Sequence, residues 1–184
     1  PIPRRQRQMC IRDRTIYDEK DKEYEYYLKK NNPIPIMGIS IINKLQKYID
    51  QVGCIDVKKT NLPPKHVEIF EKRRNDSDYK NITTCLLNKN EPMMIYNYSF
   101  SPCPYYEKPK LILAHGMYGF PFLDDKGLYG ISNRDKYVIT NKSVDDLILL
   151  KAFLSTKLAL YIFECFKYRM KYLEKYAFEM IPDI

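Results

Sequence analysis

The chain has 184 residues, of which 45% are hydrophobic, and it carries 31 Lys and Arg against 23 Asp and Glu, a formal net charge of +8. This composition is typical of one globular unit and excludes disorder of the whole chain. The longest apolar stretch, residues 158–166, contains Glu164 and is far shorter than the roughly 20 residues that cross a bilayer. No apolar segment follows the N-terminal arginines, as it would in a secretory signal. We therefore expect a cytoplasmic chain without a membrane partner.

The cysteines are widely scattered, at Cys10, Cys54, Cys85, Cys103 and Cys165, and only two histidines accompany them. Their odd number and the absence of a Cys-x-x-Cys pair indicate neither a disulfide framework nor a zinc site. We expect reduced thiols in the core and no bound metal.

The N-terminal run from Arg4 to Arg14 resembles a translated transposon-end adapter of the kind used to prepare sequencing libraries. All eleven of its residues match when they are converted back through the genetic code. We therefore assign residues 1–14 to an adapter-derived artefact that packs against nothing, and +4 of the formal charge remains without them. The alternative is a natural basic arm that follows phosphates. The remaining sequence is rich in residue types that A/T-rich codons encode. We therefore expect a metagenomic fragment, truncated at both ends, from a microbe or a large DNA virus.

The first genuine element should follow a charged segment. Residues 15–38 have few aliphatic side chains, which predicts a linker or a solvated helix that ends at a proline-rich break. Apolar residues at helical spacing then predict a helix over residues 40–52. Ser40 is its expected N-cap and Gly53 its expected stop.

The middle third of the chain has the pattern of a small sheet. Residues 60–92 are polar overall, and a short helix is predicted near residues 65–72. Residues 120–131 predict a hairpin whose turn lies at residues 124–127. Apolar runs bounded by Pro, Gly and Asn predict further strands over residues 82–87, 93–100, 110–114 and 137–139.

Helices should close the chain. Ser143 precedes Asp146 by three positions, which predicts an N-cap and a helix that runs to about residue 153. Thr156 should cap a second helix over residues 157–166, and a last helical segment follows over residues 168–181. We therefore predict an α+β fold, with a small twisted antiparallel sheet, flanking helices and a C-terminal helical segment.

Motifs of catalysis or cofactor binding are missing from the sequence. The six glycines form neither Gly-x-Gly-x-x-Gly nor a P-loop, and His66 and His115 stand 49 positions apart without a serine elbow. Asp124 and Asp125 are explained by a turn before Gly127 rather than by a metal. We expect no catalytic, cofactor-binding or metal-binding residue in this chain.

One block of the sequence carries a family pattern. Residues 108–124 form a Lys-Pro-Lys strand, a glycine and aromatic loop and a Pro-Phe strand, and residues 127–131 add a Tyr-Gly strand. This order resembles the target-recognition domain of adenine-N6 DNA methyltransferases and of fused restriction-methylation enzymes. The helical residues 149–158 and the Tyr-Leu and Ile-Pro ending of residues 168–182 are similar to the same family. The resemblance covers residues 39–184.

The resemblance implies a DNA-recognition module of a site-specific adenine DNA methyltransferase or restriction-modification protein, whose catalytic half is missing. In that family the catalytic half binds S-adenosylmethionine and receives the flipped adenine, while the recognition domain contacts bases in the major groove. The implied partners are double-stranded DNA and the missing N-terminal catalytic domain, and the fragment is not catalytic by itself. The alternative is a standalone nucleic-acid or protein interaction domain without catalysis.

The candidate DNA contacts are basic, amide and aromatic side chains in or near this block. Lysine and arginine side chains would meet phosphates, Asn133 suits an adenine edge and Arg134 a guanine edge, and Tyr118 could stack or wedge. An ordinary turn at residues 133–135 and core packing of the glycine loop are the alternatives. The candidate set is Lys108, Lys110, Tyr118, Asn133, Arg134, Lys136, Lys167, Arg169 and Lys171.

Overall fold

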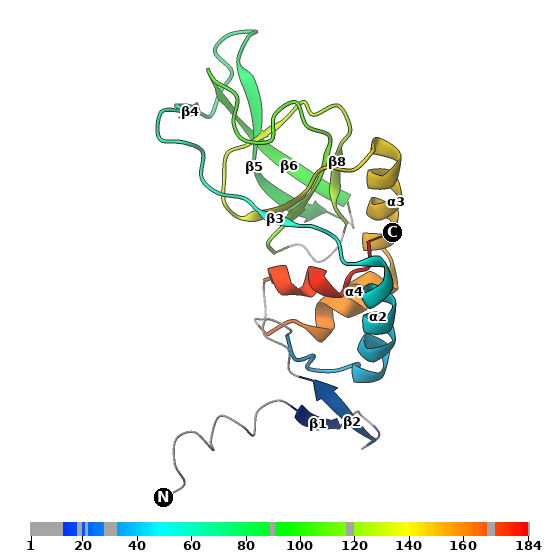
Figure 1. Ribbon diagram of the computed structural model, residues 1–184. Helices are drawn as coiled ribbons and strands as arrows, with labels where there is room; N and C mark the ends of the chain where they lie inside the picture. Colours follow the sequence, from blue (N-terminus) through cyan, green and yellow to red (C-terminus); the bar gives the residue numbers. More distant parts are fainter. Residues whose placement is uncertain are drawn as a thin grey trace, which may run out of the picture.

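The computed structural model describes residues 13–17, 20, 22–27, 33–88, 91–116, 120–168 and 172–183. These residues form an α+β fold (Figure 1). Its helices are α2 (Ile39–Val52), α3 (Val144–Leu154), α4 (Lys157–Cys165) and the 3₁₀ helix η1 (Lys175–Met180). Its strands are β1 (Asp13–Tyr17), β2 (Glu23–Tyr27), β3 (Lys58–Lys59), β4 (Ile69–Phe70), β5 (Tyr79–Asn88), β6 (Glu91–Ser99), β7 (Lys110–Ala114), β8 (Phe122–Asp124), β9 (Gly130–Ile131) and β10 (Lys136–Ile139).

The strands after α2 form two four-stranded sheets rather than the single sheet that we predicted. The first sheet has the order β3-β10-β7-β8 and is antiparallel. The second sheet has the order β4-β6-β5-β9 and is mixed, because β9 runs parallel to β5. The predicted hairpin over residues 120–131 is therefore wrong, since β8 pairs with β7 in the first sheet and β9 pairs with β5 in the second.

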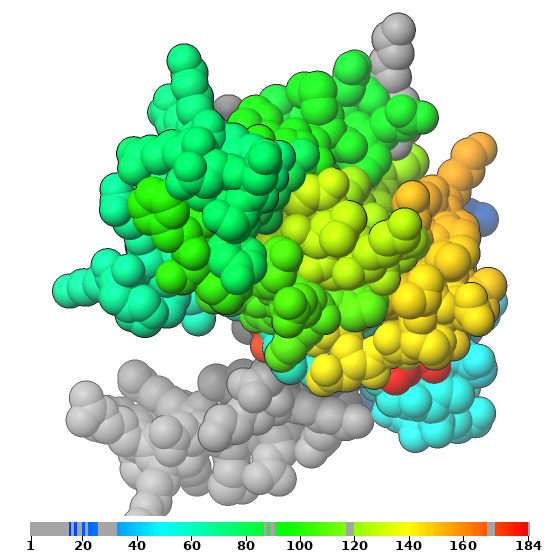
Figure 2. Space-filling view, turned by 90° about the horizontal axis from the view of Figure 1, so that it is seen from above, coloured from blue at the N-terminus to red at the C-terminus, as the bar shows by residue number. Residues whose placement is uncertain are grey.

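The first sheet is the middle layer of three. Alternate residues of a strand point to opposite faces, so β7 and β10 supply apolar side chains to both of its neighbours. Towards the helices these side chains belong to the larger core, and towards the second sheet to a smaller core. Figure 2 shows the green residues of the second sheet on one side of the molecule and the yellow, orange and cyan residues of the helices on the other. The two sets are Leu111, Leu113, Tyr137 and Ile139 on the helix side, and Ile112, Ala114 and Val138 on the sheet side.

Local signals place the two C-terminal helices where we predicted them. The Ser143 side chain accepts a hydrogen bond from the Asp146 amide, and the Thr156 side chain accepts one from the Ala159 amide. Each cap satisfies an amide that has no partner inside the helix. The buried leucines of α3 are each worth about 1.5–3 kcal/mol of transfer free energy.

The N-cap of α2 differs from the prediction for a steric reason. Gly38, with φ 68°, caps the helix instead of Ser40, and no side chain caps it. A Cβ on Gly38 would come within 2.6 Å of the Tyr161 hydroxyl, so this glycine allows α4 to approach closely. Gly53 ends the helix as predicted.

Two other predicted segments are also corrected. Residues 15–17 and 23–27 lie in strands, not in the predicted linker or solvated helix, because Thr, Ile and Tyr favour extended backbone and suit an exposed ribbon. Asp13 and Arg14 belong to β1, where they pair with Tyr27 and Tyr26. The prediction that residues 1–14 pack against nothing is therefore wrong for these two residues. Residues 1–12 lie outside the described residues. The short helix near residues 65–72 is instead a turn followed by β4.

Candidate nucleic-acid interface

Three segments that are distant in sequence meet at one end of the first sheet. The His115 amide, just after β7, donates to the Asp135 carbonyl at 3.0 Å, and the Leu173 amide donates to the His115 carbonyl at 2.7 Å. The segments after β7, before β10 and before η1 therefore lie side by side. We call this end the rim and define it by His115, Asn133, Arg134, Asp135 and Tyr172.

Aromatic packing attaches the rim to the core. The His115 ring stacks on Tyr172, with ring centres 4.6 Å apart, and contacts the edge of Tyr137 at 5.8 Å. The Tyr137 hydroxyl donates to the Leu173 carbonyl at 2.8 Å. Burial raises the pKa of Tyr137 to about 12, so its hydroxyl stays protonated and keeps this hydrogen bond at neutral pH. Ring packing of His115 thus attaches the rim to the core.

Arg134 extends from a turn whose backbone is fixed from both sides. Asn133 Oδ1 accepts from the Arg134 amide at 2.7 Å, and the Asn133 carbonyl accepts from Thr60 Oγ1 at 2.8 Å. Thr60 Oγ1 in turn accepts from the Lys136 amide at 3.1 Å. The Arg134 side chain is exposed and forms no ion pair within the described part of the chain. The side-chain oxygen of Asn133 already accepts a hydrogen bond within its own turn, which disfavours this side chain as an adenine contact.

The structure adds two lysines that sequence reasoning missed. Lys58 and Lys59 form β3, pair with Val138 and Tyr137 of β10, and are exposed. Because the next residue, Thr60, donates to the Asn133 carbonyl, β3 ends close to the turn that bears Arg134. The only sequence signal was the Lys-Lys pair itself, since no local pattern connects it to a loop more than 70 residues away.

Two of the predicted phosphate contacts are wrong because their side chains are inside the protein. Lys110 is 0% exposed, and its Nζ lies 2.5 Å from Asp124 Oδ2. Lys136 is 1% exposed, and its Nζ donates to the Thr83 carbonyl at 2.5 Å, at the bulge of β5. Burial lowers the pKa of both ammonium groups, and Asp124 opposes this for Lys110. Asp124 therefore has a structural role as the counter-charge of a buried ammonium group.

The other candidates are dispersed or not described. Lys108 is exposed but precedes β7, at the end of this five-residue strand opposite the rim, and the strand alone spans about 14 Å at 3.4 Å per residue. Lys167 is half-buried, with Nζ 3.1 Å from Glu164 Oε1. Tyr118, Arg169 and Lys171 lie outside the described residues, although in sequence they adjoin segments of the rim.

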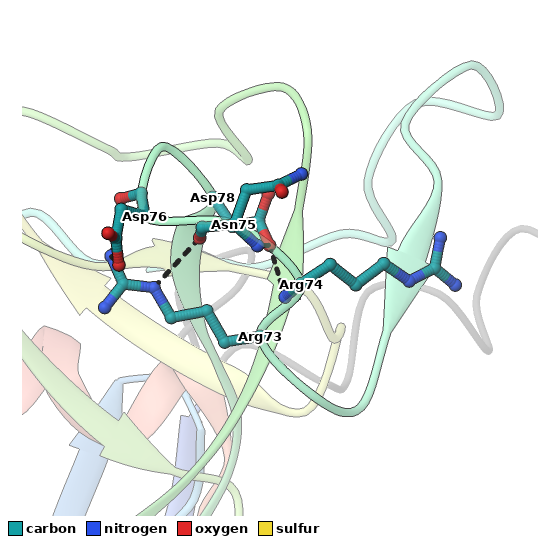
Figure 3. Close-up of polar contacts among 5 residues, drawn as sticks. All are labelled: Arg73, Arg74, Asn75, Asp76 and Asp78. Atoms are coloured by element: carbon teal, nitrogen blue, oxygen red, sulfur yellow. Dashed lines mark hydrogen bonds and ion pairs between the residues drawn. The ribbon is translucent and has the colours of Figure 1, made fainter.

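A second arginine-rich loop, between β4 and β5, uses its cations internally (Figure 3). Arg73 Nε donates to the Asn75 carbonyl at 3.0 Å. The Arg74 guanidinium lies over the Phe70 ring at 4.3 Å and 3.7 Å from Glu68 Oε1. Arg73 and Arg74 form ion pairs with Asp76 and Glu68, whereas Arg134 forms none among the described residues, so the rim is the stronger candidate for phosphate contact.

Comparisons of the chain with protein-family models, with curated proteins and with solved structures found no match. Among the described residues, no helix has the length and apolar character needed to span a membrane. Within the same residues, no group of three or more His, Cys, Asp or Glu side chains could hold a metal ion. The function is therefore argued from the rim.

Proposed function

We propose that the chain is the DNA target-recognition module of a site-specific adenine DNA methyltransferase or restriction-modification protein. The observation that carries the proposal is the rim, where exposed Arg134 lies on a fixed turn that Thr60 joins to β3, the strand of the exposed Lys58 and Lys59. The segments that bear the other family-like candidates, Tyr118 and residues 169–171, adjoin the same end in sequence. The family resemblance of residues 39–184 supplies the substrate class.

In this proposal the lysines and the arginine have different tasks. Lys58 and Lys59 contact phosphates and set the register of the duplex, which carries no sequence information. Arg134 presents a planar fork of donors that matches O6 and N7 of guanine in the major groove. The hydrogen bonds that hold its turn reduce the conformational freedom lost on binding. Methyl transfer would belong to a separate catalytic domain that binds S-adenosylmethionine.

The salt dependence of duplex binding tests the phosphate contacts. Three contacts predict a slope of log affinity against log salt of about −3, because each contributes about −0.9. K58A/K59A should reduce this slope by about 2 and weaken all sequences alike. Lys126→Ala is the matched control, because it removes an exposed cation from the turn after β8, at the opposite end of the first sheet.

Selection from a randomised duplex library tests the base contact. If Arg134 contacts a guanine, Arg134→Ala should cost about 1–3 kcal/mol on the selected site and little on other sequences. An equal loss on all sequences would restrict Arg134 to phosphate contact. If no salt-dependent binding of duplex DNA is seen at low ionic strength, the proposal is wrong and the interaction-domain alternative takes its place.

A further inference from the structure

A groove of about 570 Å³ opens between the loop at residues 64–67 and the loop at residues 101–107, next to the start of β5. It shares no lining residue with the rim. Its walls are dominated by proline and tyrosine, namely Pro64, Pro102, Pro104, Tyr79, Tyr105 and Tyr106.

Backbone hydrogen bonds hold both walls of the groove in place. The Val67 amide donates to the Pro64 carbonyl at 2.9 Å, and the Ile131 amide donates to the Pro104 carbonyl at 3.0 Å. Tyr105 and Glu107 have φ values of 68° and 59°, a left-handed conformation that is costly for residues with large side chains. Such strain persists only where the surrounding structure imposes it, so this wall is preorganised.

The loop that precedes β5 fixes the position of Tyr79, the residue of β5 that lines the groove (Figure 3). Asp78 Oδ2 accepts from the amides of Arg74 and Asn75 at 2.7 and 2.8 Å, which sets the direction in which the chain enters Tyr79. The Tyr79 ring then meets the Tyr106 ring edge to face, with centres 4.9 Å apart and planes at 89°. Two perpendicular aromatic surfaces therefore line the groove.

The tyrosines offer hydrogen-bond donors as well as flat surfaces. Within the described residues, no hydrogen bond engages the hydroxyls of Tyr79, Tyr105 or Tyr106. Burial raises the pKa of Tyr105, so its hydroxyl stays protonated. A ligand for this groove should carry flat apolar rings together with carbonyl oxygens that have no partner of their own.

Charge then selects among such ligands. Glu107 is exposed, and no Lys or Arg is among the described residues that line the groove. Glu107 would repel a phosphate group inside the groove, although His66 lines it and the exposed Lys65 and Lys108 adjoin its lining in sequence, whereas a cationic group would be attracted to the carboxylate. The lining thus favours a neutral or basic ligand over nucleic acid.

We propose that this groove binds a proline-rich peptide in the polyproline II conformation, with a basic residue of the peptide beside Glu107. Polyproline II has no internal hydrogen bonds, so its carbonyls are available to tyrosine hydroxyls. Its prolyl rings pack on aromatic side chains, and its rigidity lowers the entropy lost on binding. The groove thus provides the protein with a peptide-docking surface in addition to the rim.

Fluorescence polarisation with two labelled peptides tests the proposal. One peptide has about eight prolines, roughly 25 Å in this conformation, and ends in arginine; the other ends in glutamine. The full chain should bind the arginine peptide more tightly. Tyr106→Ala should weaken both peptides about tenfold, through loss of the aromatic surface. Tyr48→Ala, which removes an exposed tyrosine of α2 outside the groove, should change neither affinity.

Removal of the Glu107 charge separates specific docking from general adhesion. Glu107→Gln should weaken the arginine peptide up to about fivefold, the range of an exposed ion pair, and leave the glutamine peptide unchanged. Tyr106→Phe keeps the ring and should lose less affinity than Tyr106→Ala, and matching circular dichroism spectra of the two variants check that neither is misfolded. Failure of both peptides to bind, equal losses with Tyr48→Ala, or displacement of the peptide by oligothymidylate would each overturn the proposal.

Discussion

Removing either partner of the buried Lys110–Asp124 ion pair should lower the free energy of unfolding by about 3–5 kcal/mol. The two side chains are 0% and 1% exposed, and Lys110 Nζ lies 2.5 Å from Asp124 Oδ2. Lys110 Nζ also donates to the Lys108 carbonyl at 3.1 Å, and the Asp124 carboxylate accepts from the amides of Leu128 and Tyr129. A single substitution therefore leaves a charge inside the protein without its counter-charge.

The two single variants and the double variant form a thermodynamic cycle. Lys110→Met leaves the Asp124 carboxylate with two amide donors. Its loss of unfolding free energy should therefore be near the lower limit, about 3 kcal/mol. Asp124→Asn leaves the Lys110 ammonium without its carboxylate. Its loss of unfolding free energy should equal or exceed that of Lys110→Met. The double variant contains no unpaired charge, so it should lose at least about 2 kcal/mol less than the sum of the two single variants.

Urea unfolding followed by far-ultraviolet circular dichroism measures these losses, since the chain has no Trp for fluorescence. The matched control removes Lys142 from its surface ion pair with Asp183 and should cost less than about 1 kcal/mol. Losses in the single variants as small as in this control, or an additive double variant, would refute the reasoning.

The pH dependence gives an independent check of the same pair. Burial places the pKa of Lys110 in the folded state below its ordinary value of 10.5. Between the two values the unfolded chain binds a proton that the folded chain lacks, so this group makes stability rise with pH. Asp124→Asn removes the charge that opposes the shift, and its stability deficit should therefore shrink as the pH approaches 10.5.

Three further predictions concern packing, titration and capping. Gly130→Ala should cost about 1–3 kcal/mol in urea unfolding, because its Cβ would come within 2.3 Å of Asn81 Oδ1, whereas Gly53→Ala meets no atom within 4 Å and should cost only its backbone strain. Burial raises the pKa of Cys85 from 9.0 to about 11, so between pH 9 and about pH 11 the folded chain holds a proton that the unfolded chain has lost. The free energy of unfolding should therefore fall as the pH rises through this range, and the fall should be smaller in Cys85→Ala. Ser143→Ala should lower the free energy of unfolding by about 0.5–2 kcal/mol through loss of the α3 cap, and an unchanged urea midpoint would contradict this.

Elements whose stabilising contacts are local could be predicted from the sequence by itself. The caps at Ser143 and Thr156 bind amides three positions away, so the starts of α3 and α4 were predicted from a short window. The apolar run that became β7 has the same limits as its prediction, residues 110–114. The α+β class followed from these local patterns, because each specifies its own element without a distant partner.

Only the tertiary structure decided which charged residues are available at the surface. Lysine side chains are mostly exposed, so Lys110 and Lys136 were expected at the surface. Their burial depends on acceptors 14 and 53 residues away, Asp124 Oδ2 and the Thr83 carbonyl. The same holds for the rim, where hydrogen bonds of Thr60 bring the end of β3, with Lys58 and Lys59, to the turn that bears Arg134. The division of residues 120–131 between two sheets was likewise set by the distant partners β7 and β5, because the turn at residues 124–127 is compatible with either arrangement.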